Sequence, residues 1–354
     1  MSKLQNFLQY QIENHCSDLH LITGEPPILR QPNGDLKVLP EAAILTKTEI
    51  ETFIQEIIGV KGLAKLQTAK EFGCSFTLSE LQNFRVTFYQ ETRGPAIAFR
   101  SISLQIPTPE ELAIPPKILQ TVLRKDGLIL VTGPNGSGKS TTLASLINYI
   151  NHHRKCHIIT IEDPIEFTFK REKALISQRA IGLDAVSFSS AVKHTLRQDV
   201  DVIMIGEMRD LETIATAMTL AETGHLVLAT LHTDDAPRAI QRIVDVFPST
   251  QQNQIALQFS HSLSAILSQR LIPSADHTKR VCVREILLAN PGIRHAIRTH
   301  KISEIYSQMQ ISGADGMYLF DHELRKFVDQ GLITFEDALL SAHDPKHFEE
   351  NFQN

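Results

Sequence analysis

An eight-residue segment, residues 133–140, has the composition and spacing of a phosphate-binding loop. Its sequence, GPNGSGKS, fits the pattern G-x-x-x-x-G-K-[ST]. An apolar run over 128–132 precedes it and a helical pattern over 141–150 follows it, which supplies the strand and helix that this pattern requires. Glycines let backbone N–H groups point at phosphate oxygens, and the helix N-terminus adds partial positive charge. The residues expected to bind nucleotide are Gly133, Pro134, Asn135, Gly136, Ser137, Gly138, Lys139, Ser140 and Thr141.

Two side chains of this loop have specific expected roles. The ammonium group of Lys139 would reach the β- and γ-phosphates, and the hydroxyl group of Ser140 would bind Mg²⁺. The sequence therefore predicts a site for ATP with Mg²⁺. The alternative is a glycine-rich turn that binds no nucleotide.

Carboxylates follow two further apolar runs. Glu162 and Glu166 come at and after the end of the run 157–161, and Glu207 follows the run 201–206. In an open α/β sheet, ligands bind outside the carboxyl ends of the parallel strands, so these side chains would lie near the phosphates. Hydrolysis needs a metal ion against the phosphate oxygens and a group that orients water, which two acidic positions can supply. The alternative is that they cap helices or face solvent.

Two histidines flank a fourth apolar run. His225 begins the run HLVLATL and His232 follows it. A neutral imidazole at a strand end could sense the γ-phosphate by hydrogen bonding. From spacing alone, however, a structural role is the commoner one for such a histidine.

The four apolar runs also predict the fold that positions these residues. Each run is apolar on both faces, as in strands of a buried sheet, and tens of residues separate them, which leaves room for crossover helices. The fold class expected here is α/β with a mostly parallel sheet. Beyond residue 290 the pattern becomes helical.

The chain length of 354 residues suggests two domains, at roughly 100–200 residues per domain. Residues 1–105 combine an opening helical pattern with alternating stretches and predict a smaller α+β domain. Four prolines within 106–117 predict a linker, because proline removes a backbone donor and disfavours helix before it. The core domain is then expected over 118–290 and a helical C-terminal region over 291–354.

Composition excludes several classes of protein. With 42% hydrophobic and 21% charged residues, the chain is neither disordered nor collagen-like, and four scattered cysteines make no disulfide framework. No run approaches the ~18 apolar residues that span a bilayer, and no secretory signal is evident, so we expect a cytoplasmic protein. A net charge of −5 argues against a general nucleic-acid-binding surface.

Several motifs occur in a fixed order along nearly the whole chain. GPNGSGKSTT, TIEDPIEF, VIMIGEMRDLETI and ETGHLVLATLHT match a Walker A motif, an Asp box, a Walker B motif and a His box. This ordered set resembles the secretion-superfamily ATPases of type IV pili and type II secretion, most closely the PilT-type retraction group. The resemblance implies an N-terminal PAS-like domain, a RecA-like P-loop ATPase domain and a hexameric ring.

The resemblance also implies roles for individual residues. It assigns Glu207 to the Walker B role and to Mg²⁺, and Glu166 to activation of water. It favours functional roles for His225 and His232. Three arginines of the first domain match family arginines that approach the nucleotide when the domains close: Arg85, Arg93 and Arg100. A planar cation suits the charge that develops on phosphate oxygens, although strand arginines can also simply face solvent.

The branch of the family is expected to be retraction. The chain lacks the long extra N-terminal region of assembly and secretion ATPases and the four-cysteine zinc insertion. The retraction group's AIRNLIRE signature is partly kept as GIRHAIRT over 292–299, without the final Glu, and Asp-Val-Asp replaces the usual Asp-Pro-Asp at 199–201. These departures leave open an assembly or secretion motor, a PilU-like accessory ATPase, a non-hydrolysing ring component and a DNA translocase.

The expected partners follow from the same resemblance. They are other copies of the chain in a homo-hexamer, an inner-membrane pilus platform protein, and a paralogous pilus ATPase. Membrane association would be peripheral, through the platform protein at the cytoplasmic face of the inner membrane. No nucleic acid is expected.

Overall fold

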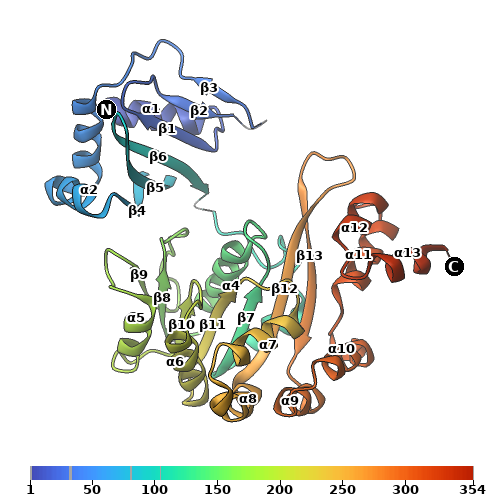
Figure 1. Ribbon diagram of the computed structural model, residues 1–354. Helices are drawn as coiled ribbons and strands as arrows, with labels where there is room; N and C mark the ends of the chain where they lie inside the picture. Colours follow the sequence, from blue (N-terminus) through green and yellow to red (C-terminus); the bar gives the residue numbers. More distant parts are fainter. Residues whose placement is uncertain (1, 32–33, 80–81, 104, 354) are drawn as a thin grey trace. The chain divides into compact units, whose positions relative to one another are not determined.

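The computed structural model describes residues 2–31, 34–79, 82–103 and 105–353 (Figure 1). The chain forms two compact units. The first runs to Ile106 and also includes Glu162–Thr168 and Ala180–Asp184. The second contains the remaining segments from Pro107 onwards. The Asp-box segment, which the sequence placed within the core domain, thus groups with the first unit.

The first unit contains an antiparallel sheet of six strands in the order β3-β2-β1-β6-β5-β4. Helices α1 (Lys3–Glu13) and α2 (Lys47–Ala69) contribute to its apolar core. A capping box starts α1, in which the Ser2 hydroxyl accepts from the Gln5 amide. The strands are β1 (Asp18–Ile22), β2 (Ile28–Arg30), β3 (Leu36–Val38), β4 (Glu71–Ser79), β5 (Gln82–Glu91) and β6 (Gly94–Ser103).

The predicted elements of this unit are present. The opening helix and the strands expected at 17–22, 84–90 and 95–104 correspond to α1, β1, β5 and β6, while residue 104 lies outside the described residues. Along β5, Phe84, Val86 and Phe88 are fully buried at alternate positions, because side chains of a strand point alternately to its two faces.

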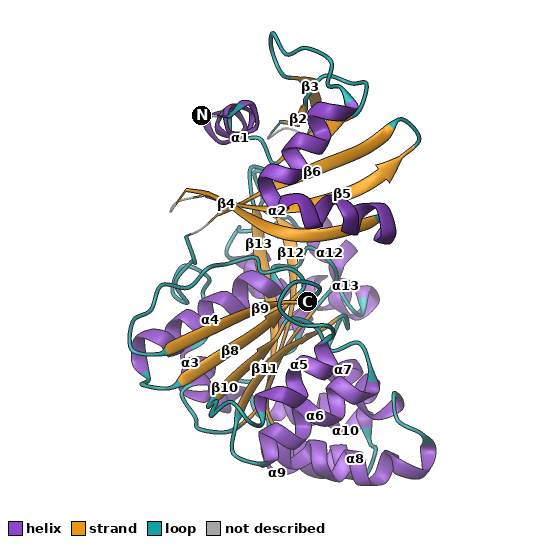
Figure 2. Ribbon diagram, turned by 90° about the vertical axis from the view of Figure 1, so that its left-hand side faces the viewer, coloured by secondary structure: helices purple, strands orange, loops and turns teal. Residues whose placement is uncertain are grey.

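The second unit contains a seven-stranded sheet in the order β13-β12-β7-β11-β10-β8-β9. Strands β12, β7, β11, β10 and β8 pair in parallel, and β13 is antiparallel to β12. Helices α4 and α6 lie on opposite faces of this sheet (Figure 2). The strands are β7 (Gly127–Thr132), β8 (His157–Glu162), β9 (Leu175–Ala180), β10 (Val202–Ile205), β11 (Leu226–Leu231), β12 (Leu263–Pro273) and β13 (Arg280–Leu288). The helices up to this hairpin are α3 (Pro116–Val122), α4 (Lys139–His153), α5 (Phe188–Thr195), α6 (Leu211–Glu222), α7 (Ala236–Asp245) and α8 (Ser249–Ser262).

The four predicted apolar runs form β7, β8, β10 and β11, and the mostly parallel sheet is confirmed. Every residue of β7, β10 and β11 is buried, which explains why these runs lack alternation. Strand β9 and the β12–β13 hairpin were not predicted.

The proline-rich segment differs from the expected linker. From Pro107 onwards it belongs to the second unit, where Ile114 is buried and the carbonyl group of Leu112 accepts a hydrogen bond from Arg284. Helix α3 then begins at Pro116, inside the expected linker, because proline is well suited to the first turn of a helix. Proline density therefore marked an irregular segment that packs on the second unit.

The last part of the second unit is helical, as expected. Its elements are α9 (Pro291–Arg298), α10 (Ile302–Ile311), the 3₁₀ turn η1 (Gly313–Asp315), α11 (Phe320–Asp329), α12 (Phe335–Ser341) and α13 (Pro345–Gln353). Phe320 and Leu324 of α11 pack against Ile272 and Val283 of the hairpin in a shared apolar core. In the described part of the chain, no helix is long and apolar enough to cross a bilayer.

Candidate nucleotide site

The loop between β7 and α4 has the backbone of a phosphate cradle. Gly133 and Gly138 have φ angles of +144° and +86°, and Gly138 is the left-handed residue that begins α4. A Cβ atom at Gly133 would lie 2.2 Å from the carbonyl oxygen of Gln269, so only glycine fits there. Pro134, Asn135, Gly136 and Ser140 are exposed, whereas Ser137 is buried, and Gly138 and Thr141 are half-buried.

Lys139 is folded into this loop. Its side chain lies in a residue that is only 8% exposed, and Nζ donates to the carbonyl oxygens of Gly133 at 2.8 Å and Pro134 at 2.9 Å. The buried hydroxyl of Ser137 has no hydrogen-bond partner in the part of the chain that the structure describes. A phosphate group would give both donors an anionic acceptor, which makes a stronger hydrogen bond than a neutral carbonyl does. The loop therefore fits a phosphate group.

Strand β12 holds the loop from one side. Gln269 donates from Nε2 to the carbonyl oxygen of Ser137 at 2.8 Å, and its Oε1 accepts from Thr142 Oγ1 at 2.9 Å. Next to it, Thr132 Oγ1 donates to Ser268 Oγ at 2.8 Å. Sequence reasoning missed Gln269, because it lies far from the motif that it supports. The one signal was a polar Ser-Gln pair inside an apolar run.

Glu207 and His232 join the loop to a carboxylate. The Oε1 atom of Glu207 lies 2.8 Å from Nε2 of His232 and 2.7 Å from Nε of Arg209. The other ring nitrogen of His232, Nδ1, lies 3.4 Å from Nζ of Lys139. The tautomer that satisfies both contacts accepts at Nδ1 and carries its proton on Nε2. Lys139, His232 and Glu207 thus form a continuous polar chain, which we call the Lys–His–Glu chain.

The charge state of Glu207 follows from this arrangement. Burial opposes ionisation of the carboxyl group, but the hydrogen bond from Arg209 and the proximity of His232 outweigh it, so the pKa of Glu207 lies below its usual value. Glu207 is therefore a carboxylate at neutral pH. Together with the Ser140 hydroxyl it offers the oxygen ligands that Mg²⁺ prefers.

His225 is not brought to the phosphate loop of its own chain. It precedes β11, whose first residue pairs with Gly127, while His232 follows the end of β11 beside the loop. Six residues of strand separate the two histidines, a distance of about 20 Å. His225 places Nδ1 3.1 Å from the carbonyl oxygen of Leu220. The expectation that both histidines contact the nucleotide of one chain is therefore corrected, because a strand separates them.

Glu166 and the three arginines lie in the first unit, and each arginine is paired there with a carboxylate. Arg85 Nη1 is 3.5 Å from Glu166 Oε1, and Arg100 Nε is 2.8 Å from Asp18 Oδ1. Arg93 pairs with Glu25 and Glu91, at 2.5 and 3.2 Å. The side chains of Arg85, Arg93 and Arg100 are 42%, 48% and 66% exposed. They form accessible ion pairs, each of which contributes little to stability.

The Asp-box segment is held by strands β4 and β5. Ser75 Oγ donates to the carbonyl oxygen of Ile165, and Asn83 Nδ2 donates to Thr168 Oγ1 at 2.8 Å. With the Arg85–Glu166 contact, these bonds fix Glu166 within the first unit. Glu162, which ends β8, is buried, and Asp163 is exposed.

Comparison with known proteins gives this arrangement a family. Residues 108–340 match the family model described as type II/IV secretion system protein. The chain is 39% identical over 345 residues to the type IV pilus retraction ATPase PilT of Pseudomonas aeruginosa, covering 98% of this chain and 99% of that protein. It is also 39% identical to the type IV pilus ATPase PilU of the same organism, covering 96% and 88%.

A solved structure extends the likeness to the fold. The crystal structure of the pilus retraction motor PilT with bound ADP superposes with a TM-score of 0.92 and 42% identity, covering 99% of this chain and all of that one. The antiparallel first unit and the mixed, mostly parallel sheet of the second unit match this structure. From the family match, the two relatives and this superposition, the chain belongs to the type II/IV secretion ATPase family and is a nucleotide-binding ATPase.

Proposed function

We propose that this protein is a Mg²⁺-dependent motor ATPase that powers disassembly and retraction of a type IV pilus. The observation that carries the proposal is the Lys–His–Glu chain, which links the phosphate loop to the Walker B carboxylate in a chain similar to a retraction motor over its whole length. The first unit would be a PAS-like domain and the second a RecA-like domain. Copies of the chain would assemble into a hexamer.

The loop residues would bind the nucleotide as follows. Lys139 would exchange its two carbonyl acceptors for phosphate oxygens, and backbone amides of the glycine-rich loop would accept the remaining charge. Ser140 and Glu207 would hold Mg²⁺, which supplies positive charge against the phosphate oxygens when bound. His232 would connect the Lys139 ammonium to Glu207, so that a change at the phosphates alters the hydrogen bonding of the carboxylate.

Residues of the first unit would complete the reaction. Glu166 would accept a proton from the attacking water, and Arg85, Arg93 and Arg100 would neutralise charge that develops on the phosphates. In the structure these groups are occupied in ion pairs within the first unit. Hydrolysis would therefore require the arginines to exchange carboxylate partners for phosphate, and that exchange would couple nucleotide state to domain movement. Their exposure supports such an exchange. We assign no direct contact to His225 within one chain.

The proposed setting is the cytoplasmic face of the inner membrane, where the ring would act on a pilus platform protein. Deleting the gene and counting pili on the cell surface tests the direction of force. A retraction motor's loss leaves abundant surface pili. Loss of pili after deletion would show instead that the protein extends a fibre, as an assembly or secretion motor does.

A second candidate is a PilU-like accessory ATPase that works beside a paralogous motor. The observation in its favour is the equal identity, 39%, to PilT and PilU of the same organism. Co-purification and a deletion of the paralogue distinguish the two. A principal motor supports retraction when the paralogue is absent, whereas an accessory ATPase does not.

A further inference from the structure

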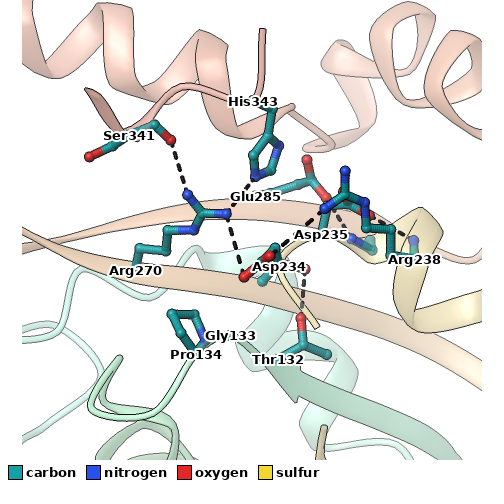
Figure 3. Close-up of polar contacts among 12 residues, drawn as sticks. Thr132, Gly133, Pro134, Asp234, Asp235, Arg238, Arg270, Glu285, Ser341 and His343 are labelled. Carbon is teal, nitrogen blue, oxygen red and sulfur yellow. Dashed lines mark hydrogen bonds and ion pairs between the residues drawn. The ribbon is translucent and has the colours of Figure 1, made fainter. Parts of the chain in front are cut away.

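Strand β12 presents two consecutive side chains to different parts of the second unit. Gln269 is hydrogen-bonded to the phosphate loop and to the first turns of α4. Arg270, the next residue, points to the opposite face, as successive side chains of a strand do. The backbone that fixes the phosphate loop therefore also carries an arginine that faces away from it (Figure 3).

Arg270 lies between two segments that are distant in sequence. Its Nη1 atom donates to the carbonyl oxygen of Ser341 at 3.1 Å, and Nη2 lies 3.2 Å from Nε2 of His343. The same Nη2 lies 3.5 Å from Oδ1 of Asp234. Figure 3 shows the guanidinium group with Ser341 and His343 on one side and Asp234 on the other. The side chain is only 23% exposed, and the guanidinium carbon lies 5.2 Å from the centre of the Phe320 ring.

Asp234 connects this arginine to the proposed catalytic residues. It lies two residues after His232, in the segment between β11 and α7. His232 in turn contacts Lys139 and Glu207. Displacing Asp234 would therefore move the histidine that joins the phosphate loop to the Walker B carboxylate.

The C-terminal side of the contact is a short segment, residues 341–344, held mainly by polar groups. Its amides at His343 and Asp344 donate to the two carboxylate oxygens of Asp321, at 2.8 and 3.0 Å. The His343 ring stacks on Phe320 at 5.0 Å. His343 and Asp344 border a cavity of about 530 Å³, so packing does not enclose the segment on that side.

We propose that Arg270 is a positioning residue that couples docking of segment 341–344 to the geometry of the nucleotide site. Its guanidinium holds the segment on one side and the Asp234 end of the His box on the other, while the adjacent Gln269 holds the phosphate loop. Docking of the C-terminal segment thereby sets the active arrangement of the Lys–His–Glu chain. The inference rests on the proposed roles of Lys139, His232 and Glu207 in ATP turnover.

Steady-state kinetics of the full-length ATPase test the coupling. Arg270→Met keeps the length and apolar stem of the side chain and removes the fork, so kcat should fall by about two- to thirtyfold, the range seen for residues that link sites. The KM for ATP should change less, because the phosphate loop retains Gln269. Arg270→Lys should be intermediate, since one ammonium cannot reach all three partners.

Arg238→Met is the matched control. Arg238 pairs with the same Asp234 and with Asp235, but its side chain is 65% exposed, and no hydrogen bond joins it to segment 341–344 within the described part of the chain. Its kcat should stay within about twofold of the wild type. A fall equal to that of Arg270→Met would show that Asp234 pairing alone matters and would overturn the coupling.

A double-mutant cycle separates coupling from general damage. Asp321→Ala removes both acceptors of the segment, so its kcat should fall as in Arg270→Met, and the double variant should lose little more. Fully multiplicative losses in the double variant would overturn the proposal.

Hydrogen exchange on the wild-type protein tests the same claim without a variant. Coupling is reciprocal, so ADP binding should slow exchange of the His343 and Asp344 amides, and unchanged exchange would contradict it. Lys139→Ala identifies the other failure. If that variant keeps full turnover, the proposed nucleotide residues are wrong. If it loses turnover while Arg270→Met does not, only the coupling is wrong.

Discussion

The two units hold their charged functional residues in different ways. In the second unit, Lys139, His232 and Glu207 are connected to one another beside the phosphate loop, and the lysine is almost fully buried. In the first unit, Arg85 and the other two arginines occupy separate, half-exposed ion pairs. The comparison teaches that nucleotide binding and nucleotide hydrolysis draw on different units. Binding residues are preassembled in one, whereas catalytic partners in the other must be released first.

The largest expected effect is on hydrolysis without loss of binding. Glu166→Gln removes the proposed proton acceptor, so phosphate release should slow by about 10²–10⁴-fold. Nucleotide affinity should stay near the wild-type value, because Glu166 is fixed in the first unit. Single-turnover phosphate release and fluorescent-nucleotide titration measure the two quantities. Glu56→Gln, an exposed position of the same unit, is the control. Parallel losses of affinity and turnover would remove the distinction between the units.

Arginine substitutions should rank by how firmly each is held. Arg85 has one carboxylate at 3.5 Å, whereas Arg93 has two, at 2.5 and 3.2 Å. Because Arg85 is the easier to release, Arg85→Ala should lower kcat by more than Arg93→Ala, and by up to about 10²–10³-fold if it donates to the transition state. The reverse order would mean that these resting pairs do not limit access to the nucleotide.

The two histidines should separate clearly. His232→Gln disturbs the Lys–His–Glu chain, and loss of one hydrogen bond of about 0.5–1.5 kcal/mol predicts a two- to twelvefold fall in kcat. His225→Gln lies a strand length away and should change kcat less. Turnover of the two variants under saturating ATP makes the comparison. A larger loss for His225→Gln would place its function elsewhere, for example against a neighbouring copy.

The smallest effect concerns a buried carboxyl group outside the nucleotide site. Burial raises the pKa of Glu285 to about 7, against hydrogen bonds from the amides of Ala236 and Phe320. The folded protein thus holds a proton that the unfolded chain releases near pH 4.5. The stabilising contribution of this group is full below pH 4.5, declines as pH rises towards 7, and is constant above it.

Thermal unfolding across pH 5–8 checks this sign. The stability of the wild type relative to Glu285→Gln should fall between pH 5 and 7 and then level off. A difference that rises with pH would mean that Glu285 is ionised in the folded protein.

The sequence predicted the parts of this molecule that depend on local pattern. The phosphate loop, the strands β7, β8, β10 and β11, and the helical C-terminal region all have signals within a short window. The β12–β13 hairpin was missed although β12 is as buried as those strands, because it comes directly after a helix with no turn signal between α8 and β12.

Missing the hairpin had consequences for the site. Gln269 and Arg270 act through contacts with residues more than 30 positions away, and no local motif encodes such contacts. The separation of His225 from His232 was visible in principle, since the run between them is one strand long. The grouping of Glu166 with the first unit depends on contacts with Ser75 and Asn83 from distant strands, which one sequence does not reveal.

The central claim is that the second unit alone carries the preassembled nucleotide-binding site. Comparing ATP binding and phosphate release for Lys139→Ala and wild-type protein tests it most directly. We expect the variant to lose phosphate release by about 10²–10³-fold and to bind nucleotide much more weakly, because the buried ammonium is the main cation of the loop. Undiminished phosphate release by Lys139→Ala would contradict the account.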